Sequence, residues 1–184
     1  MTAKQPQSYN EYLSLSQILE LSGFAEDQSS HLNFVICHQI TELWFKLVNN
    51  YLADFIDRGE LSALLSADAV IRQINATWEV FEHIPSSEFL KIRQSLNGIS
   101  GAESLQYFKT IELIKLSLKE CKDRNSIQTL SRIDSSFQKW KVSHINITEK
   151  LISDRPGTGG STGADYLQRQ GHSPLVNHAD LNQF

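Results

Sequence analysis

The chain has 184 residues, of which 40% are hydrophobic and 21% charged, a composition typical of one globular domain and unlike that of a disordered chain. Its net charge of -4 comes from scattered acidic and basic residues, so no basic block favours nucleic acid or an anionic membrane as a partner. The sequence has no apolar run of membrane-spanning length and no signal-peptide pattern at its start, so we expect a cytoplasmic protein. Cys37 and Cys121 lack the spacing of a zinc site and are interpreted as reduced thiols.

Apolar residues recur at helical spacing, which predicts an all-α, single-domain helical bundle over residues 1–184. The first helix is expected from about Tyr9 to Leu21. The second is expected from Ser30 to Arg58 and ends at Gly59, a residue favoured after a helix C-terminus. The third begins after Ser66, which is expected to cap it, and ends before Pro85. Its predicted inward residues are Val70, Ile74, Trp78 and Phe81.

The second half of the chain predicts further helices and a long C-terminal segment. A short fourth helix spans Ser87 to Leu96. A fifth ends near Asp123 and is expected to bury Leu105, Phe108, Ile111 and Leu118. The sixth has one seam, spaced by three and four residues, made of Leu130, Ile133, Phe137, Trp140, His144, Ile147 and Leu151. Residues 153–184 form a Gly-rich loop and a tail, and residues 1–13 form an N-terminal arm.

His144 is the one polar member of that apolar seam, so its imidazole is expected to point into the interior. A buried polar group is normally paired, and the seam alone favours a core histidine bonded to a carbonyl or carboxylate. The functional interpretation is a metal or haem ligand. Both interpretations stay open on the pattern alone.

His38 shares a helical face with Phe34 and Glu42, each one turn away. A histidine and a glutamate at this spacing can hold a metal in a carboxylate bundle, but no second Glu-x-x-His motif occurs here. A solvated or mutually bonded pair is the alternative. Arg93 follows Phe89 by one turn and could bind a carboxylate through parallel N–H bonds, or form a surface salt bridge.

Four blocks of the sequence, in order, resemble the tryptophan 2,3-dioxygenase family. The first is similar to the family's Y-x-x-Y-L and includes Tyr9, Tyr12 and Leu13. The second is close to F-I-x-x-H-Q-x-x-E-L-W-F-K and runs from Phe34 through His38 to Lys46. The third is similar to F-x-x-F-R-x-x-L-x-x-x-S-G-x-x-S and runs from Phe89 through Arg93 to Ser104. The fourth is similar to W-x-x-x-H followed by G-T-G-G-x-x-G-x-x-Y-L and includes Trp140, His144, Gly157, Thr158, Gly159, Gly160, Gly163, Tyr166 and Leu167.

The resemblance implies a haem b pocket in which His144 binds the iron, with Trp140, Gly159 and Gly160 also at the cofactor. His38 would lie on the distal side and hydrogen-bond an indole N–H. The implied substrate-binding residues are Phe34, Phe89, Arg93 and Thr158, together with Tyr9, Tyr12 and Leu13 from a neighbouring subunit.

The implied activity is the O2-dependent cleavage of the indole C2–C3 bond of L-tryptophan to N-formylkynurenine by a homo-oligomer, a dimer or tetramer. The alternatives are a shortened relative that oxygenates another aromatic amino acid or an indole intermediate, and a non-catalytic haem-binding protein. The chain departs from the family by a shorter segment between Arg93 and His144, by Ser29-Ser30-His31 in place of H-D-E, by Ile92 in place of an aromatic residue, and by Ala102-Glu103 in place of an aromatic-Gln pair.

Overall fold

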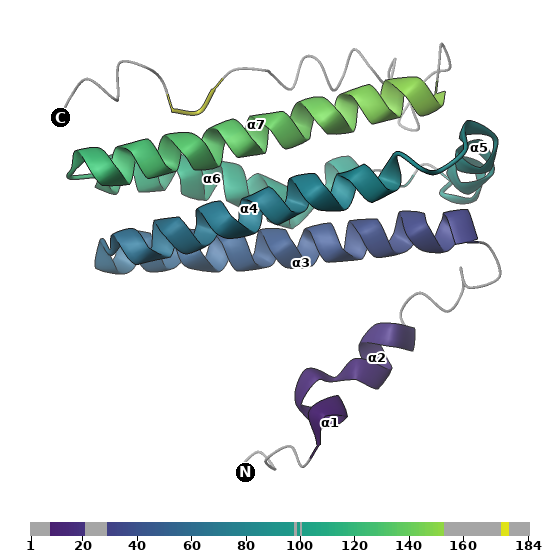
Figure 1. The fold of residues 1–184 in the computed structure, drawn as a ribbon, viewed down its shortest axis with the longest axis horizontal. Helices are drawn as coiled ribbons and strands as arrows, with labels where there is room; N and C mark the ends of the chain where they lie inside the picture. The colour runs from purple at the N-terminus through teal and green to yellow at the C-terminus, as the bar shows by residue number, and fades with distance from the viewer. Residues whose placement is uncertain (1–7, 21–28, 98, 100, 153–173, 177–184) are drawn as a thin grey trace.

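A computed structural model describes residues 8–20, 29–97, 99, 101–152 and 174–176, and all regular structure in these ranges is helical (Figure 1). The predicted all-α class is therefore confirmed. None of the helices in these ranges is long and apolar enough to cross a membrane. The predicted division of residues 1–184 into one domain with an arm and a tail includes segments outside these ranges, and it stays a prediction.

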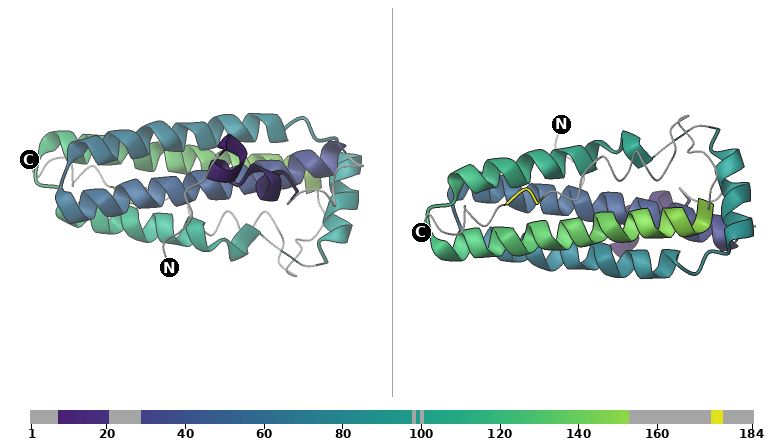
Figure 2. Two further views of the ribbon diagram at one scale, coloured as in Figure 1. Left: turned by 90° about the horizontal axis from the view of Figure 1, so that it is seen from below. Right: turned by 90° about the horizontal axis from the view of Figure 1, so that it is seen from above.

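Long helices pack side by side as a bundle, and a short helix crosses one end of it (Figures 1 and 2). The bundle helices are α3 (Ser29–Arg58), α4 (Leu61–Phe81), α6 (Leu105–Glu120) and α7 (Arg124–Ile152), and the crossing helix is α5 (Ser86–Ser95). Helix α3 packs between α4 and α6, while α7 packs against α4. Contact between α6 and α7 is the least extensive of the four neighbouring pairs, and α3 and α7 are diagonally opposed.

The α3–α4 connection forms as the sequence predicts. Gly59 has a positive φ of 69°, which glycine adopts without steric cost, and its N–H donates to the carbonyl of Phe55 at 2.8 Å. The predicted start of α4 was wrong, because Glu60 is the N-cap and Ser66 lies inside the helix. The Ser66 hydroxyl donates to the carbonyl of Ser62 at 2.9 Å, so it does not cap the N-terminus of α4.

Helix α6 follows the predicted inward face only in part, since Ile111 and Leu118 are partly buried against the core but the other two predicted residues are exposed. Leu105 is 81% exposed and Phe108 46% exposed, whereas the buried positions are Thr110, Leu113, Ile114 and Ser117. The reason lies in a polar link to α3: the Thr110 hydroxyl donates to Asn49 Oδ1 at 2.9 Å, and Asn49 Nδ2 donates to the carbonyl of Gln106 at 3.1 Å. These bonds turn the Thr110 face inward despite its polar residues.

Helix α7 confirms the predicted seam, since its apolar members Leu130, Ile133, Phe137, Trp140, Ile147 and Leu151 are all buried. Only three residues separate α6 from α7, and Asp123 caps α7 by accepting the N–H of Ser126 at 3.0 Å. Asn75 Nδ2 of α4 donates to the carbonyl of Ser136 at 3.0 Å, which ties α4 to α7.

The buried carboxylate of Asp134 on α7 holds the short C-terminal segment 174–176. One carboxylate oxygen, Oδ2, accepts the backbone N–H groups of Leu175 at 2.7 Å and Val176 at 2.9 Å. Val176 thereby joins the hydrophobic core. At the same end of the contact between α4 and α7, Asp68 of α4 pairs with Arg72 and with Arg132 of α7.

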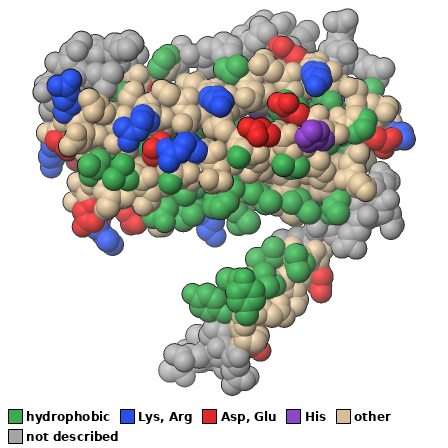
Figure 3. Space-filling view, viewed as in Figure 1, with side chains coloured by type: hydrophobic (Ala, Val, Ile, Leu, Met, Phe, Trp, Pro, Cys, Tyr) green, Lys and Arg blue, Asp and Glu red, His purple; other side chains and the backbone are tan. Residues whose placement is uncertain are grey.

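The predicted first helix is divided into α1 (Tyr9–Leu13) and α2 (Leu15–Glu20). The break lies at Ser14, whose φ of 53° is left-handed and therefore incompatible with a continuous helix. Neither helix has a buried residue, and both lie apart from the bundle (Figures 1 and 3). This arm therefore presents apolar side chains that the described part of the same chain does not cover.

Candidate functional site

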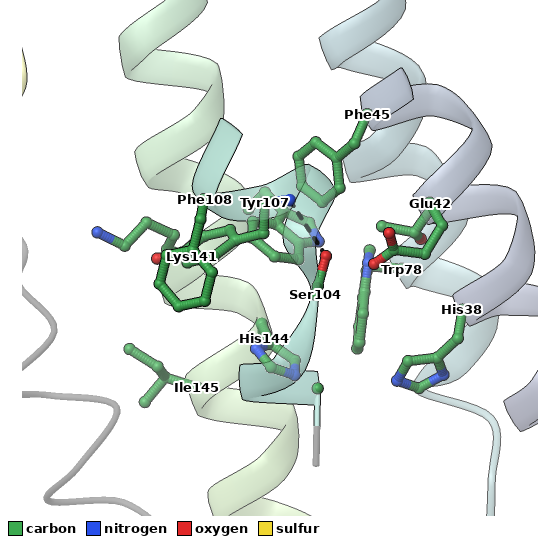
Figure 4. A pocket seen from close by; sticks show the side chains of 13 residues that line it. His38, Glu42, Phe45, Trp78, Ser104, Tyr107, Phe108, Lys141, His144 and Ile145 are labelled. Carbon is green, nitrogen blue, oxygen red and sulfur yellow. Dashed lines mark hydrogen bonds between the residues drawn. The ribbon is translucent and has the colours of Figure 1, made fainter. Parts of the chain in front are cut away.

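A largely apolar cavity opens in the half of the bundle nearer α5, enclosed by α3, α4, α6 and α7 (Figure 4). It contains about 780 Å³ of space when the solvent at its open mouth is included. The residues that line it are His38, Thr41, Glu42, Phe45, Trp78, Gly101, Ser104, Tyr107, Phe108, Trp140, Lys141, His144 and Ile145.

His38 presents a hydrogen-bond acceptor to this cavity. Its Nδ1 lies 2.7 Å from the carbonyl oxygen of Phe34, one turn earlier on α3. Because a carbonyl can only accept, Nδ1 carries the proton, and Nε2 of the neutral ring keeps a free lone pair. Burial lowers the pKa of His38, and the bond to Phe34 and the charge of Glu42 oppose that shift. The neutral form is therefore favoured.

His144 is held by aromatic rings on α7 and α4. It stacks on Trp140, with ring centroids 5.5 Å apart and planes within 3°, and meets Trp78 edge-on at 4.7 Å. Burial, and then the nearby His38, lower the pKa of His144 to about 4. The imidazole is consequently neutral at pH 7 and can offer a nitrogen lone pair to a metal.

Trp78 stands between the two histidines, since His38 also meets its ring edge-on at 5.5 Å (Figure 4). The indole N–H groups of Trp78 and Trp140 are buried, and neither has a hydrogen-bond partner in the described part of the chain. Tryptophan N–H groups usually find a partner when buried. Both side chains belong to the cavity wall, but the two N–H groups themselves are enclosed by protein.

The start of α6 forms the rim of the cavity. The short helix η2 (Gly101–Glu103) leads into Ser104, whose hydroxyl oxygen accepts the N–H of Tyr107 at 3.1 Å and caps α6. Tyr107 then stacks on Phe137 of α7, with centroids 5.6 Å apart. These contacts fix the first turn of α6 beside the cavity.

The structure brings together three of the predicted site residues, namely His38, Trp140 and His144. Phe34 and Phe89 do not line the cavity; they pack on each other with centroids 6.2 Å apart, and Phe34 supports His38 at 4.3 Å. Phe89 thus acts on the site through Phe34.

The other predicted residues are not placed at the cavity. Arg93 lies on α5 and is not among the lining residues. Tyr9, Tyr12 and Leu13 lie on the exposed arm. Thr158, Gly159 and Gly160, and the turn at Tyr166 and Leu167, lie outside the described residues.

Sequence reasoning missed several lining residues, of which Trp78 and Lys141 matter most. Trp78 was predicted to point inward, and the need of a buried indole N–H for a partner was a signal that it borders a site. Lys141 lies one turn before His144, a spacing that places both on one face of α7. Ser104 belongs to the third block of the resemblance, which was a signal for it, whereas Tyr107 gave none.

His144 is the cavity residue best placed to bind a metal through a neutral imidazole. The described residues contain no cluster of three or more His, Cys, Asp or Glu side chains that could hold a bare ion. A metal inside a planar macrocycle needs only an axial protein ligand, and His144 offers a neutral imidazole in an apolar wall.

No protein-family model matches the chain. It is similar to proteins named tryptophan 2,3-dioxygenase. The one from Pseudomonas fluorescens is 23% identical over 88% of this chain and 85% of the relative. The one from Bacillus thuringiensis subsp. konkukian is 22% identical over 90% and 88%, and the one from Ruegeria sp. is 22% identical over 88% and 86%. The first alignment runs over 242 residues, more than the 184 of the chain, so that relative has internal residues without a counterpart here.

Proposed function

Because the chain is a distant member of the tryptophan 2,3-dioxygenase family, we propose that it is a haem-dependent oxygenase. The proposed reaction is the O2-dependent cleavage of the indole C2–C3 bond of L-tryptophan, which gives N-formylkynurenine. The observation that carries this proposal is the pair of neutral histidines, His38 and His144, at one apolar cavity on either side of Trp78.

The residues of the cavity fit haem b. His144 would bind the iron, and the wall at Trp140 and Ile145 would contact the macrocycle. Bound haem would supply the redox chemistry that joins oxygen to the substrate. The chain supplies the axial ligand, the apolar wall and the orientation of the substrate.

His38 is the proposed orienting group for the substrate. Its Nε2 lone pair, fixed by the bond from Nδ1 to the carbonyl of Phe34, can accept an indole N–H. Phe34 and Phe89 hold the ring of His38 in place by aromatic contact. Their predicted role as direct walls for the substrate stays a prediction.

Arg93 and Thr158 are the proposed partners of the substrate carboxylate, and Gly159 and Gly160 are proposed to approach the cofactor. Arg93 does not line the cavity in the described part of the chain. This observation favours a second candidate, an indole compound that lacks a carboxylate. The comparison of L-tryptophan with tryptamine separates the two, since loss of a charge-assisted pair costs about 2–5 kcal/mol.

The decisive experiment is to load the protein with haem, reduce it, add O2 and measure product mass with L-tryptophan, tryptamine, indole and L-tyrosine. N-formylkynurenine from L-tryptophan alone supports the first proposal. Oxygenated products from indole or tryptamine at equal or greater rate support the second. Haem binding without any oxygenated product leaves a haem-binding protein and contradicts both.

Assembly into a homo-oligomer is also proposed, because the N-terminal arm exposes apolar side chains: Tyr9 and Tyr12 are each 73% exposed and Leu19 is 68% exposed. Such short helices are marginal alone and need a surface to cover their apolar side. Deletion of residues 1–13 should weaken association and substrate affinity while haem stays bound. A monomeric full-length chain in sedimentation, with full activity after the deletion, would contradict this assembly.

A further inference from the structure

The side chain of Trp78 fills the space between the two cavity histidines (Figure 4). Its ring centroid lies 5.5 Å from that of His38 on α3 and 4.7 Å from that of His144 on α7, and both contacts are edge-on. Only 3% of Trp78 is exposed. The two imidazoles are therefore separated by an indole ring and not by open space.

This position of Trp78 competes with a macrocycle for the same space. The proposed haem site has the iron on His144 and the substrate at His38, so the porphyrin would lie between these two side chains. An indole and a porphyrin cannot occupy one place, because atoms in a packed interior already lie at van der Waals contact. While the helices keep their positions, the side chain has to give way to the larger ring.

The contacts of Trp78 leave its ring able to change rotamer. Its other aromatic neighbours are Phe81, with centroids 4.8 Å apart, and Trp140, at 6.0 Å. The indole N–H has no hydrogen-bond partner in the described part of the chain, so no directional bond from this group holds the ring. The side chain also borders the cavity, which offers space next to it. A rotation of the ring therefore exchanges apolar contacts without breaking a hydrogen bond.

Resting on the proposed haem site, we propose that Trp78 controls the access of haem to His144: its indole occupies the place of the macrocycle and rotates away when the cofactor binds. The conformation that accepts haem is then a minor one, and the apparent affinity is reduced by the fraction of chains that adopt it. A residue of this kind differs from an ordinary wall residue in the sign of its effect. A smaller side chain at this position improves haem binding, whereas loss of a wall contact weakens it.

The test measures association and dissociation rates of carbon monoxide-bound ferrous haem by stopped-flow absorbance, with the full-length wild type, Trp78→Leu and Trp78→Phe. Trp78→Leu should bind haem roughly tenfold faster than the wild type, as expected if about a tenth of the wild-type chains accept haem, and its dissociation rate should change little. Trp78→Phe should lie between the two. Trp44→Phe is the matched control, because Trp44 is partly buried on α3 and does not line the cavity, and it should behave as the wild type.

An unchanged association rate in Trp78→Leu, with faster dissociation, would show that Trp78 is a wall of the haem site; this result would overturn its role in access and leave the haem proposal standing. An equal gain in Trp44→Phe would indicate a general loosening of the bundle and would also overturn that role. If Trp78→Leu does not fold, Trp78→Phe decides, because its smaller ring should still speed association. Absence of haem binding in the wild type and in both Trp78 variants would overturn the haem site itself.

Discussion

Buried polar groups on helices α4 and α7 have different surroundings in the two halves of these helices. Towards the α3–α4 turn, Asp68 pairs with Arg132, Asn75 bonds to the carbonyl of Ser136, and Asp134 holds the segment 174–176. Towards α5, aromatic rings and two histidines surround a cavity, and the buried indole N–H groups of Trp78 and Trp140 have no partner in the described part of the chain. The first region links its helices through charged and amide side chains, although Asp68 Oδ1 and Asn75 Oδ1 also lack a partner there, whereas the second leaves space between its helices.

Truncation of Phe137 should have the largest effect on stability, because this fully buried ring packs behind the cavity wall against Phe45 and Tyr107. Phe137→Ala should lower the free energy of unfolding by about 3–5 kcal/mol, measured by urea denaturation. Phe108→Ala at the cavity rim is the control and should cost less than about 1 kcal/mol. Similar losses in the two variants would remove the distinction between the buried core behind the cavity and its exposed rim.

Replacement of His38 should affect turnover but not cofactor content. His38→Ala removes the acceptor Nε2 while His144 and the apolar wall remain, so haem should bind normally. Turnover of L-tryptophan should fall roughly tenfold to a hundredfold, because orientation of the indole contributes part of the rate. Haem content comes from the Soret band and turnover from product formation. Loss of haem in this variant would show that His38 helps to form the cavity instead.

The cavity histidines should make stability depend on pH. The pKa of His144 is lowered to about 4 in the folded protein, whereas its usual value in an unfolded chain is about 6.5. Between about pH 4 and 6.5 the unfolded chain therefore binds a proton at this residue more readily than the folded protein does. Stability should fall as the pH drops from about 6.5 to 4 and should not change further from this group below 4. Because His144 is partly in contact with solvent, we expect the free energy of unfolding to fall by about 1–2 kcal/mol over this pH range.

Denaturation of the haem-free protein at pH 7 and pH 4.5 measures this effect. His144→Gln should show a smaller difference between the two pH values than the wild type, and replacement of the exposed His83 should show the wild-type difference. Equal pH dependence in all three proteins would mean that His144 is solvated in the folded state. His38 contributes in the same direction, because burial lowers its pKa too.

Regular helices made much of this fold and part of its site predictable. Helix α3 ends at Gly59 as expected, and the seam of α7 placed Trp140 and His144 correctly, because residues three and four apart share a helical face. The inward face predicted for helix α6 was only partly right, because Ile111 and Leu118 pack against the core whereas Leu105 and Phe108 are exposed. Its buried face includes Thr110, which is satisfied by Asn49 of another helix, and a bond of this kind is not visible in the periodicity of one segment.

The remaining site residues depend on how the helices pack. Glu42 and Lys141 lie on different helices, and only the packing of the bundle shows that they border one cavity. Ser104 and Tyr107 reach the site because α6 starts there. The sequence contains these residues, but it does not contain the distances between helices from which the cavity arises.

The role of His144 as the axial ligand of a haem in this cavity is tested by haem titration of the wild type, His144→Gly and His83→Ala, with imidazole added to each. The wild type and His83→Ala should bind one haem per chain with the Soret band of histidine-ligated iron. His144→Gly should bind more than about a hundredfold more weakly, and imidazole should restore the band. An unchanged Soret band and affinity in His144→Gly without imidazole would contradict the account.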